Sequence, residues 1–481
     1  MDLRGLGAII DLGRGENWSP DRLGGEIARR ASLLRARNVG PGQRVIVAHG
    51  GTAEFFADLF AVWRVGACAA CVHPELTEAQ LDNIAAFVEP AAILVARGET
   101  RARRSIPTIW LGEGEGAAAF GASAAEVFAS DDPALILFTS GTTGAPKGVV
   151  HSHRSLEARV GLNRTHIGDD AIARALCVLP THFGHGLIGN CLTPLSAGHD
   201  LFLYPTHSVA EISRVGSLID EHAITFMSSV PALWNVALKA SRRPGAPALR
   251  QIHVGSAPLS ARLWRSIIDW CGTDNVVNMY GITETANWIA GASARNFALE
   301  DGLVGRMWGG RAAVRREDGA IVPVGEGELM IDSPSRMQGY FRRDDLTASV
   351  LCDTWYCTGD TGRIDQAGVI RLSGRRSEEI NRAGVKIQPT EIERVLEAHP
   401  EIAEACCFAL PDAVSGEIAA VAIVPAGGSN LDVAAVQSWC AGRLHRELTP
   451  ERWYILSSLP RSDRGKVLRR EVRERCLKGG S

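Results

Sequence analysis

One stretch of the sequence combines glycines with small hydroxyl residues and ends in a single lysine, a composition that suits phosphate binding. It follows the apolar residues 135–138 and reads TSGTTGAPKG over residues 139–148. Glycines expose backbone N–H groups, which can donate hydrogen bonds to phosphate oxygens together with the Ser and Thr hydroxyls. The lysine adds a positive charge. The sequence therefore predicts a phosphate-binding loop made by Thr139, Ser140, Gly141, Thr142, Thr143, Gly144 and Lys147.

This loop differs from the Walker type, which ends in Gly-Lys followed by Ser or Thr. Here Pro146 precedes Lys147 and Gly148 follows it. A nucleotide hydrolase or regulator of the Walker class is therefore disfavoured.

Four later segments carry residue types that suit nucleotide chemistry. They read NMYGITETA over 278–286, YCTGDTGRID over 356–365, SGRRSEEINRAGVKIQPTEIE over 373–393 and PRSDRGKVLRR over 460–470. Tyr280 offers a flat face to an adenine ring, and Gly281 leaves room for a ligand to approach. Glu284 carries a carboxylate that can hold Mg²⁺.

In their order and spacing, these five segments resemble the adenylate-forming (AMP-binding) superfamily, which includes acyl-CoA synthetases, adenylation domains and firefly luciferase. The resemblance extends from about residue 40 to residue 475. It implies an enzyme that uses ATP and Mg²⁺ to convert a carboxylic acid into an acyl-adenylate, with release of pyrophosphate. A catalytically inactive relative would be expected to lack Lys466, Glu284 or Asp360, and all three are present.

The resemblance also implies a role for each site residue. A positioned ammonium that contacts both anionic reactants lowers the barrier at the α-phosphate, and this role falls to Lys466. The catalytic set is Lys466, Glu284 and Thr283, with Glu284 as the metal ligand. Asp360 and Arg375 are expected at the ribose. The remaining nucleotide contacts are expected from Gly255, Ser256, Ala257, Pro258, Asn278, Met279, Tyr280 and Gly281.

The expected acid pocket carries no carboxylate for a substrate ammonium group. Adenylation domains for α-amino acids place an Asp where this chain has Phe183. An unpaired ammonium in an apolar pocket is costly, so an ordinary α-amino acid is disfavoured. An aryl or medium aliphatic acid suits the expected lining of His182, Phe183, Met227, Ser228, Val254, Ile282 and Trp288. His182 and His185 have no third ligand nearby, so no metal site is predicted there.

The acyl acceptor stays open between CoA, a carrier-protein thiol and an amine. Relatives rotate the C-terminal domain about an Asp or Lys, where this chain has Ser377. A Gly-Gly pair usually follows, and here it is Ala383-Gly384. Gly384 can let a phosphopantetheine arm pass the backbone. C-terminal Arg and Lys residues can meet CoA phosphates or an acidic carrier protein, and we favour CoA.

Composition limits the partners and the cellular location that are expected for this protein. The 481 residues are 46% hydrophobic with a formal net charge of -3, so no nucleic-acid partner is expected. No signal peptide is apparent, and no stretch reaches the roughly 18 apolar residues of a membrane span. Eleven cysteines, an odd number, favour reduced thiols and a cytoplasmic location. We interpret Cys68 and Cys71 as structural thiols in a buried strand.

The elements that position these residues follow an α/β pattern. Apolar strands alternate with amphipathic helices through the first 300 residues, which predicts parallel-rich sheets with helices on their faces. Thr77, with Gln80 three residues later, predicts a helix cap. After about residue 309, hairpin signals predict a small β-barrel-like subdomain. We expect an N-terminal AMP-binding domain over residues 1–376 and a small mobile α/β domain over residues 377–481 that carries the catalytic lysine.

Overall fold

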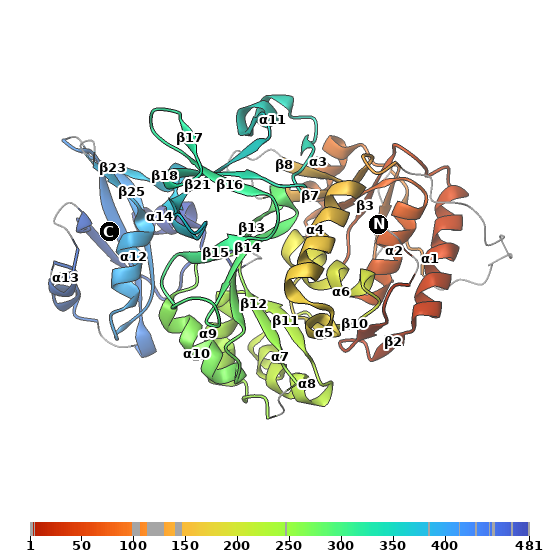
Figure 1. The fold of residues 1–481 in the computed structure, drawn as a ribbon, viewed down its shortest axis with the longest axis horizontal. Helices are drawn as coiled ribbons and strands as arrows, with labels where there is room; N and C mark the ends of the chain where they lie inside the picture. Colours follow the sequence, from red (N-terminus) through yellow and green to blue (C-terminus); the bar gives the residue numbers. More distant parts are fainter. Residues whose placement is uncertain are drawn as a thin grey trace.

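The computed structural model describes residues 3, 5–98, 106–112, 129–139, 147–245, 248–382, 385–412, 414–428, 431–441, 443–444, 448–462 and 465–479. Five residues of the predicted phosphate loop, Ser140, Gly141, Thr142, Thr143 and Gly144, lie outside these ranges, as does Gly384. The described chain is a mixed α/β protein with three sheets. Its N-terminal elements (red) and C-terminal elements (blue) lie at opposite ends of the molecule (Figure 1).

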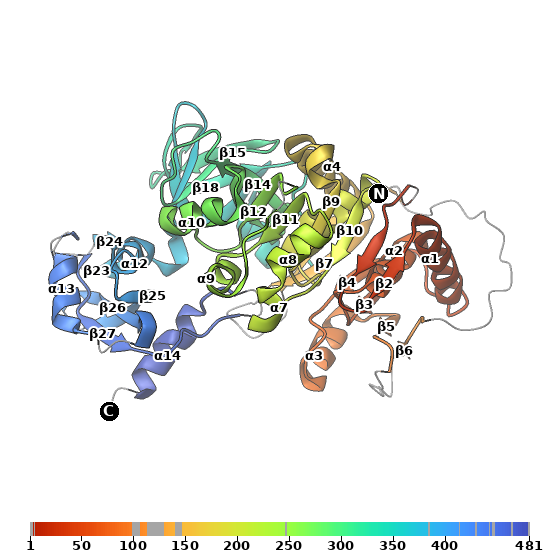
Figure 2. The ribbon, with the colours of Figure 1, turned by 90° about the horizontal axis from the view of Figure 1, so that it is seen from below.

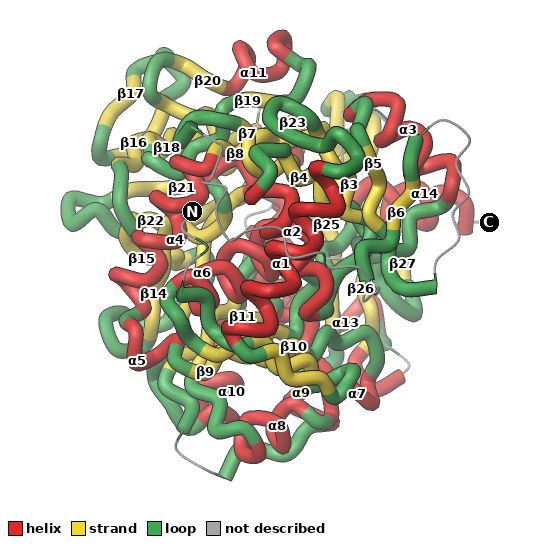
Figure 3. Tube along the Cα trace, turned by 90° about the vertical axis from the view of Figure 1, so that its right-hand side faces the viewer, coloured by secondary structure: helices red, strands yellow, loops and turns green. Residues whose placement is uncertain are grey.

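The first sheet has the strand order β19-β8-β7-β4-β3-β5-β6. Strands β3 to β7 run parallel, whereas β8 and β19 are antiparallel to their neighbours. The bounds are β3 Arg44–Val47, β4 Cys68–Cys71, β5 Ala92–Leu94, β6 Thr108–Ile109, β7 Pro133–Thr139, β8 Lys147–Ser152 and β19 Gly339–Tyr340. The helices of this part are α1 Pro20–Arg35, α2 Ala53–Arg64 and α3 Glu78–Val88. The side of the molecule formed by α1 and α2 faces the viewer in Figure 3.

Side-chain alternation explains why this sheet is covered on both faces. Val45 and Val47 of β3 pack into the main core, whereas Ile46 packs on the opposite face with residues of α3. The predicted cap of α3 is confirmed, because Thr77 and Gln80 form a reciprocal capping box.

The second sheet contains fifteen described strands in the order β17-β16-β18-β21-β22-β15-β14-β13-β12-β11-β9-β10-β1-β2, with β20 beside β21. Strands β1, β10, β9, β11, β12 and β13 form its parallel half. Their bounds are β1 Ile9–Asp11, β9 Arg174–Cys177, β10 Asp200–Leu203, β11 Phe226–Ser229, β12 Gln251–Val254 and β13 Val276–Ile282, with β2 Glu16–Trp18 at the edge. The two sheets share one apolar core, and α2 is buried within it.

The predicted antiparallel subdomain follows along the same sheet. Its strands are β14 Asn287–Ser293, β15 Leu303–Met307, β16 Arg311–Arg315, β17 Ile321–Val322, β18 Gly325–Asp332, β20 Leu351–Cys352, β21 Trp355–Ile364 and β22 Ile370–Arg375. Pairing of β15 with both β14 and β22 joins it to the parallel half. The helices around this sheet are α4 His153–Ile167, α5 Asp169–Ile172, η1 His185–Leu192, α6 Thr193–Ser196, α7 Val209–Ser213, α8 Val215–Glu221, α9 Pro231–Ala240, α10 Ala261–Cys271, η2 Thr283–Thr285 and α11 Asp344–Val350.

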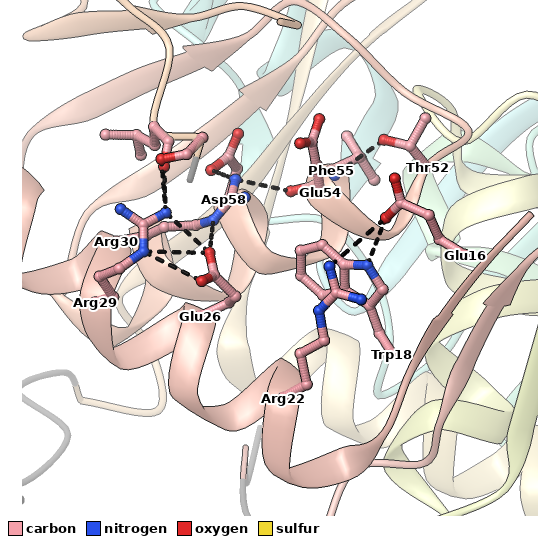
Figure 4. A network of polar contacts seen from close by, with 12 residues as sticks. Glu16, Trp18, Arg22, Glu26, Arg29, Arg30, Thr52, Glu54, Phe55 and Asp58 are labelled. Atoms are coloured by element: carbon pink, nitrogen blue, oxygen red, sulfur yellow. Dashed lines mark hydrogen bonds and ion pairs between the residues drawn. The ribbon is translucent and has the colours of Figure 1, made fainter. Parts of the chain in front are cut away.

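A buried ion pair ties α1 to α2. The Arg30 guanidinium contacts Asp58 at 2.5 Å and Glu26 at 3.1 Å, and Asp58 also contacts His49 at 2.8 Å. Figure 4 shows Glu26, Arg30 and Asp58 turned toward one another between the two helices. Removal of one partner from such a buried pair costs about 3–5 kcal/mol, because the other charge is left uncompensated.

The C-terminal residues form a third sheet with its own core. The sheet order is β24-β23-β26-β25, with β27 parallel to β26. The bounds are η3 Arg376–Glu378, β23 Ile380–Arg382, β24 Val385–Ile387, α12 Pro389–Glu397, β25 Ile402–Asp412, β26 Gly416–Pro425, η4 Ala426–Gly428, α13 Val433–Ala441, β27 Arg452–Ile455 and α14 Arg469–Gly479. A separate cluster of buried apolar side chains fills this part. Figures 1 and 2 both show it as a body at the end of the molecule opposite α1.

The cysteines agree with the expectation of reduced thiols. All eleven are described, and all are free thiols. Cys68 and Cys71 lie in the buried strand β4, as predicted. Burial raises the pKa of Cys68 to about 12, so this thiol stays protonated at neutral pH.

Candidate active site

The predicted phosphate loop starts at the carboxyl edge of the first sheet. Parallel strands β3, β4 and β7 end at this edge, where α/β sheets bind ligands. Thr139 ends β7 and pairs with Lys147 at the start of β8, so these two residues hold the ends of the loop together. The seven residues between them, 140–146, lie outside the described residues, and the phosphate contacts of the five predicted among them stay a prediction.

Lys147 rests against Glu284 and Tyr340. Its ammonium lies 3.7 Å from a Glu284 carboxylate oxygen and 3.9 Å from the centre of the Tyr340 ring. The Tyr340 hydroxyl donates a 2.7 Å hydrogen bond to the same carboxylate. Burial, and then the Glu284 charge, raise the pKa of Tyr340, so its hydroxyl remains a donor. The structure thus brings two predicted residues together and adds Tyr340, which the sequence did not indicate.

The Thr283–Thr285 turn is held at all three of its carbonyls. The Thr283 carbonyl accepts from His151 Nε2 at 2.8 Å, and the Glu284 carbonyl accepts from the Met337 N–H at 2.8 Å. The Thr285 carbonyl accepts from the Ser335 hydroxyl at 2.8 Å. Burial lowers the pKa of His151 to about 4, so its imidazole is neutral and Nε2 carries the proton. The turn is therefore fixed before any ligand binds.

Two left-handed residues follow this turn. Ala286 has φ 56° and Asn287 has φ 92°, although neither is glycine. Such conformations cost about 1–3 kcal/mol each and persist only where the surroundings impose them. The surrounding contacts therefore hold these two residues in place, and they fix how strand β14 leaves the Glu284 turn.

The buried side chain of Arg159 is linked by hydrogen bonds to the Thr283–Thr285 turn. The Arg159 guanidinium on α4 donates to the hydroxyls of Ser333 and Ser335 and to the Trp308 carbonyl. Its side chain is fully buried, and no described carboxylate forms an ion pair with it. Burial lowers the pKa of Arg159 to about 9. The Ser335 hydroxyl in turn donates to the Thr285 carbonyl, so one side chain connects Arg159 to the turn.

The predicted ribose residues form one connected group. The Tyr280 hydroxyl donates to Asp360 Oδ2 at 2.6 Å, and the Arg375 guanidinium contacts Asp360 Oδ1 at 2.7 Å. Burial raises the pKa of Asp360, while the charges of Arg375 and Lys466 act in the opposite direction. Lys466 is thus within electrostatic range of this carboxylate.

The loop that carries Lys466 docks on the N-terminal domain. Gly465 has φ 71°, and a Cβ there would lie 3.2 Å from Ala232 Cβ at the start of α9. Arg461 donates to the Gly465 carbonyl at 2.7 Å and forms an ion pair with Glu404 at 2.7 Å. The surrounding protein, and then the Arg375 charge, lower the pKa of Lys466, although its side chain keeps access to solvent. The structure thereby brings the predicted catalytic lysine to the predicted nucleotide residues.

Ion pairs flank the predicted hinge. Ser377 lies in η3 between Arg376, which contacts Glu328 at 3.0 Å, and Glu378, which contacts Arg469 at 3.3 Å. Lys386 reaches Glu317 across the domain boundary. Of these three contacts, the exposed Lys386–Glu317 pair is the one that joins residues on the two sides of the predicted boundary, and such a pair adds little stability.

The predicted acid-pocket residues come from neighbouring strands of the second sheet. Strands β9, β11, β12 and β13 are parallel, so their carboxyl ends lie side by side. The chain after β9 supplies His182 and Phe183, whose ring centres are 5.4 Å apart. The other residues are Met227 and Ser228 of β11, Val254 of β12, Ile282 of β13, and Trp288 of β14.

Two further nucleotide-segment residues have structural partners. The Asn278 amide donates to the Leu303 carbonyl at 2.7 Å and braces β13. The loop Gly255, Ser256, Ala257 and Pro258 follows β12. A Cβ on Gly255 would approach the Met279 carbonyl to 3.0 Å, so this position leaves no room for a larger residue.

The sequence did not indicate His185 as a neighbour of the expected acid-pocket residues. His185 opens the π-helix η1 and contacts the Ser228 hydroxyl at 2.6 Å and the Ser256 hydroxyl at 2.7 Å. Short π-helical segments are frequent at functional sites. The flanking residues Gly184 and Gly186 were the available signal.

Comparison with known proteins agrees with this geometry. Residues 5–341 match the model of the AMP-binding enzyme family, and residues 391–466 match that of the AMP-binding enzyme C-terminal domain. The chain belongs to the AMP-binding enzyme family. It is an AMP-forming acid ligase, and ATP is its nucleotide.

Individual relatives cover nearly the whole chain. The feruloyl-CoA synthase of Amycolatopsis sp. is 30% identical over 93% of this chain and 92% of its own length. ATP-bound MatB from Rhodopseudomonas palustris superposes with a TM-score of 0.85 at 26% identity, over 97% of this chain and 95% of its own. The amide bond synthetase McbA from Marinactinospora thermotolerans superposes with a TM-score of 0.87 at 26% identity, over 98% of both chains. Within the described ranges, none of the helices has both the length and the apolar character that crossing a membrane requires.

Proposed function

We propose that this AMP-binding enzyme activates an aryl or medium aliphatic carboxylic acid and transfers the acyl group to the thiol of CoA. The observation that carries this proposal is the position of Lys466. The C-terminal domain presents this lysine within electrostatic range of Asp360 and Arg375, the expected ribose residues. The proposed boundary between the two domains lies between residues 376 and 377, next to the hinge Ser377.

In the first half-reaction, the substrate carboxylate attacks the α-phosphorus of ATP and pyrophosphate leaves. Negative charge builds on the α-phosphate oxygens, and the Lys466 ammonium offsets it. Lys147 and the phosphate loop hold the β- and γ-phosphates, which leave. Tyr280 stacks on the adenine while Asp360 and Arg375 hold the ribose.

The Glu284 site fits a magnesium ion. Its carboxylate is buried, and among the described residues it forms an ion pair with Lys147 at 3.7 Å. Glu284 would hold Mg²⁺ with Thr283 beside it, and the ion would neutralise phosphate charge. The fixed Thr283–Thr285 turn keeps this carboxylate in place.

In the second half-reaction, the C-terminal domain turns about Ser377. The contacts of Lys386 with Glu317 and of Gly465 with Ala232 must then break. The pantetheine arm passes Gly384, the thiolate attacks the acyl carbonyl, and AMP leaves. A serine at the hinge permits this rotation of the domain. It lacks the charge of the Asp or Lys that the family resemblance implies at this position.

An amine or a carrier protein is the alternative acceptor. The similarity to an amide bond synthetase supports the amine, and the similarity to feruloyl-CoA synthase supports both CoA and an aryl acid. No described carboxylate lies among the expected pocket residues, which argues against an α-amino acid substrate.

The test is acid-dependent pyrophosphate release over a panel of aryl, aliphatic and amino acids, with CoA added or withheld. We expect release with one class of acid and consumption of the acyl-adenylate once CoA is added. An acyl-adenylate that persists with CoA but disappears with an amine would replace CoA by the amine. Absence of acid-dependent release across the panel would contradict the proposal.

A further inference from the structure

Two thiols lie next to each other on the hairpin that leads to the expected ribose carboxylate. The sulfurs of Cys352 on β20 and Cys357 on β21 are 3.7 Å apart. Cys352 pairs across the hairpin with Trp355, and Cys357 is the next residue of β21 on the same face. The two thiols are therefore diagonal neighbours on one face of the hairpin.

One of these thiols is accessible from solvent. All eleven cysteines lie within the described residues, and Cys352 is the one that is not buried. Cys357 is 6% exposed and packs against Ala313 and Met330. A dissolved oxidant therefore meets Cys352 first, with the thiol of Cys357 beside it.

The surroundings of the two sulfurs suit different chemical roles. Arg315 lies within electrostatic range of both thiols, although its ion pair with Glu328 offsets part of its charge. Burial, and then the hydrogen bond with Cys352, raise the pKa of Cys357 to about 11, so this thiol is protonated at neutral pH. Cys352 is thus suited to react with an oxidant, and Cys357 to react with the product.

A bond between these sulfurs requires an adjustment of the hairpin. A disulfide has an S–S distance of about 2 Å, so the sulfurs must approach by nearly half of their present separation. Strand β21 is held from its other side by β18, where Cys357 pairs with Met330. Strand β20 has two residues and, among the described strands, pairs with β21 alone. The adjustment therefore falls mainly on β20.

Strand β20 is connected to the nucleotide residues through Tyr340. It follows directly after α11 (Figure 3), where the Thr347 hydroxyl accepts from the Tyr340 N–H at 2.9 Å. Leu351 of β20 packs in the same apolar cluster as Tyr340. The Tyr340 hydroxyl holds the Glu284 carboxylate at 2.7 Å. A displacement of β20 and α11 would therefore disturb the contact that positions Glu284.

We propose that Cys352 and Cys357 are a modification site, that hydrogen peroxide oxidises them to a reversible disulfide, and that this disulfide weakens the binding of ATP. Formation of the bond is independent of the proposed function. Its effect on ATP rests on that function, because it takes Glu284 as a residue of the nucleotide site.

The chemistry takes two steps. The Cys352 thiolate attacks one peroxide oxygen and becomes a sulfenic acid, and the hydroxide that leaves takes up the proton of the thiol as water. Cys357 then gives up its proton and attacks the Cys352 sulfur, and the sulfenic hydroxyl leaves with that proton as a second water. Two thiols thus lose two electrons and two protons to one peroxide, and a dithiol reductant reverses the change.

The first measurement detects the bond itself. Cleavage after Arg343 and Arg363 places both cysteines in one tryptic peptide, residues 344–363, which contains no other cysteine. The full-length enzyme is treated with equimolar hydrogen peroxide, alkylated and digested, and this peptide is examined by mass spectrometry. We expect it to lose two hydrogens and to escape alkylation, and dithiothreitol should restore both thiols.

The second measurement is KM for ATP in acid-dependent pyrophosphate release, before and after the same treatment. We expect a rise of at least about fivefold on oxidation, reversed by dithiothreitol, because a hydrogen bond to a charged group is weakened.

The variant Cys352→Ser, at a partly exposed position, should keep the KM of the reduced enzyme and lose the response to peroxide. Cys357→Ala should lose the response in the same way. Cys271→Ser is the matched control, since Cys271 is the most exposed of the buried cysteines at 9%, and this variant should keep the response.

A peptide that gains oxygen on Cys352 or stays fully reduced would overturn the disulfide. A disulfide that forms without a change in KM would overturn the effect on ATP, and so would a response that survives in Cys352→Ser. Absence of acid-dependent pyrophosphate release from the reduced enzyme would contradict the proposed function, whereas the disulfide seen in the peptide would still stand.

Discussion

The two lysines of the site are held in different ways. Lys147 is held through its ammonium, which lies 3.7 Å from Glu284 and 3.9 Å from the Tyr340 ring centre. Lys466 is held through its backbone, because Ser462 contacts its N–H and its carbonyl accepts from the Ser462 N–H at 2.8 Å. Its ammonium forms no ion pair with any carboxylate in the described part of the chain.

This difference matches the two tasks proposed for them. A phosphate can replace Glu284 as the partner of Lys147, so that lysine serves a group that binds and then leaves. Lys466 keeps its ammonium free for the reacting α-phosphate, and its backbone contacts move with the C-terminal domain. We therefore propose that the N-terminal domain binds the leaving phosphates and that the C-terminal domain supplies the catalytic lysine.

The largest expected effect comes from Lys466→Ala. Loss of the ammonium should slow adenylation by about 10² or more, because the charge at the α-phosphate is no longer offset. Single-turnover formation of the acyl-adenylate measures this rate. Lys478→Ala, an exposed lysine of α14, is the control and should leave the rate unchanged.

Lys147→Ala should act mainly on nucleotide binding. Hydrogen bonds to charged groups contribute about 1.5–3 kcal/mol, so KM for ATP should rise about 10- to 100-fold. The kcat at saturating ATP should change far less than in Lys466→Ala. Equal losses in kcat for both lysine variants would remove the distinction between their tasks.

The pH dependence of adenylation should follow Lys466. The surrounding protein and Arg375 lower its pKa below the usual 10.5, and the reaction requires the ammonium form. The rate should therefore fall as pH rises through this lowered pKa. A pH profile measured at saturating substrates should show an alkaline limb that Lys466→Ala lacks, and the same limb in that variant would assign it to another group.

Gly465→Ala should give the smallest effect. A left-handed alanine costs about 1 kcal/mol, and here its Cβ also lies 3.2 Å from Ala232. Gly427 has a similar φ of 68°, and a Cβ there would meet no atom within 4 Å, so Gly427→Ala carries only the strain. Both variants should lose similar stability in thermal unfolding, whereas only Gly465→Ala should slow adenylation. Equal rates for the two variants would show that docking at Ala232 is unimportant.

Motif residues close together in sequence were predictable, whereas their distant partners were not. The alternating pattern located the parallel strands, and Thr77 with Gln80 located a helix cap. Tyr340 meets Glu284 from 56 residues away, and Arg159 meets Ser335 from 176 residues away. No local periodicity records such contacts, because they depend on which strands become neighbours.

The pocket wall shows the same limit. The sequence indicated Ser228 and Trp288 as lining residues, but His185 looked like half of an incomplete metal site. Its contacts to Ser228 and Ser256 span 43 and 71 residues. They arise because η1 packs against β11 and lies beside the loop that follows β12, an arrangement that only the assembled sheet establishes.

The most direct test of the central claim separates the two half-reactions in Lys466→Ala. Acyl transfer from a preformed acyl-adenylate to CoA is measured beside adenylation from ATP and the acid. If Lys466 acts at the α-phosphate, adenylation falls about 10² or more while transfer stays within about threefold of the unmodified enzyme. Equal loss in both half-reactions, or undiminished adenylation, would contradict the assignment of Lys466 as the catalytic residue.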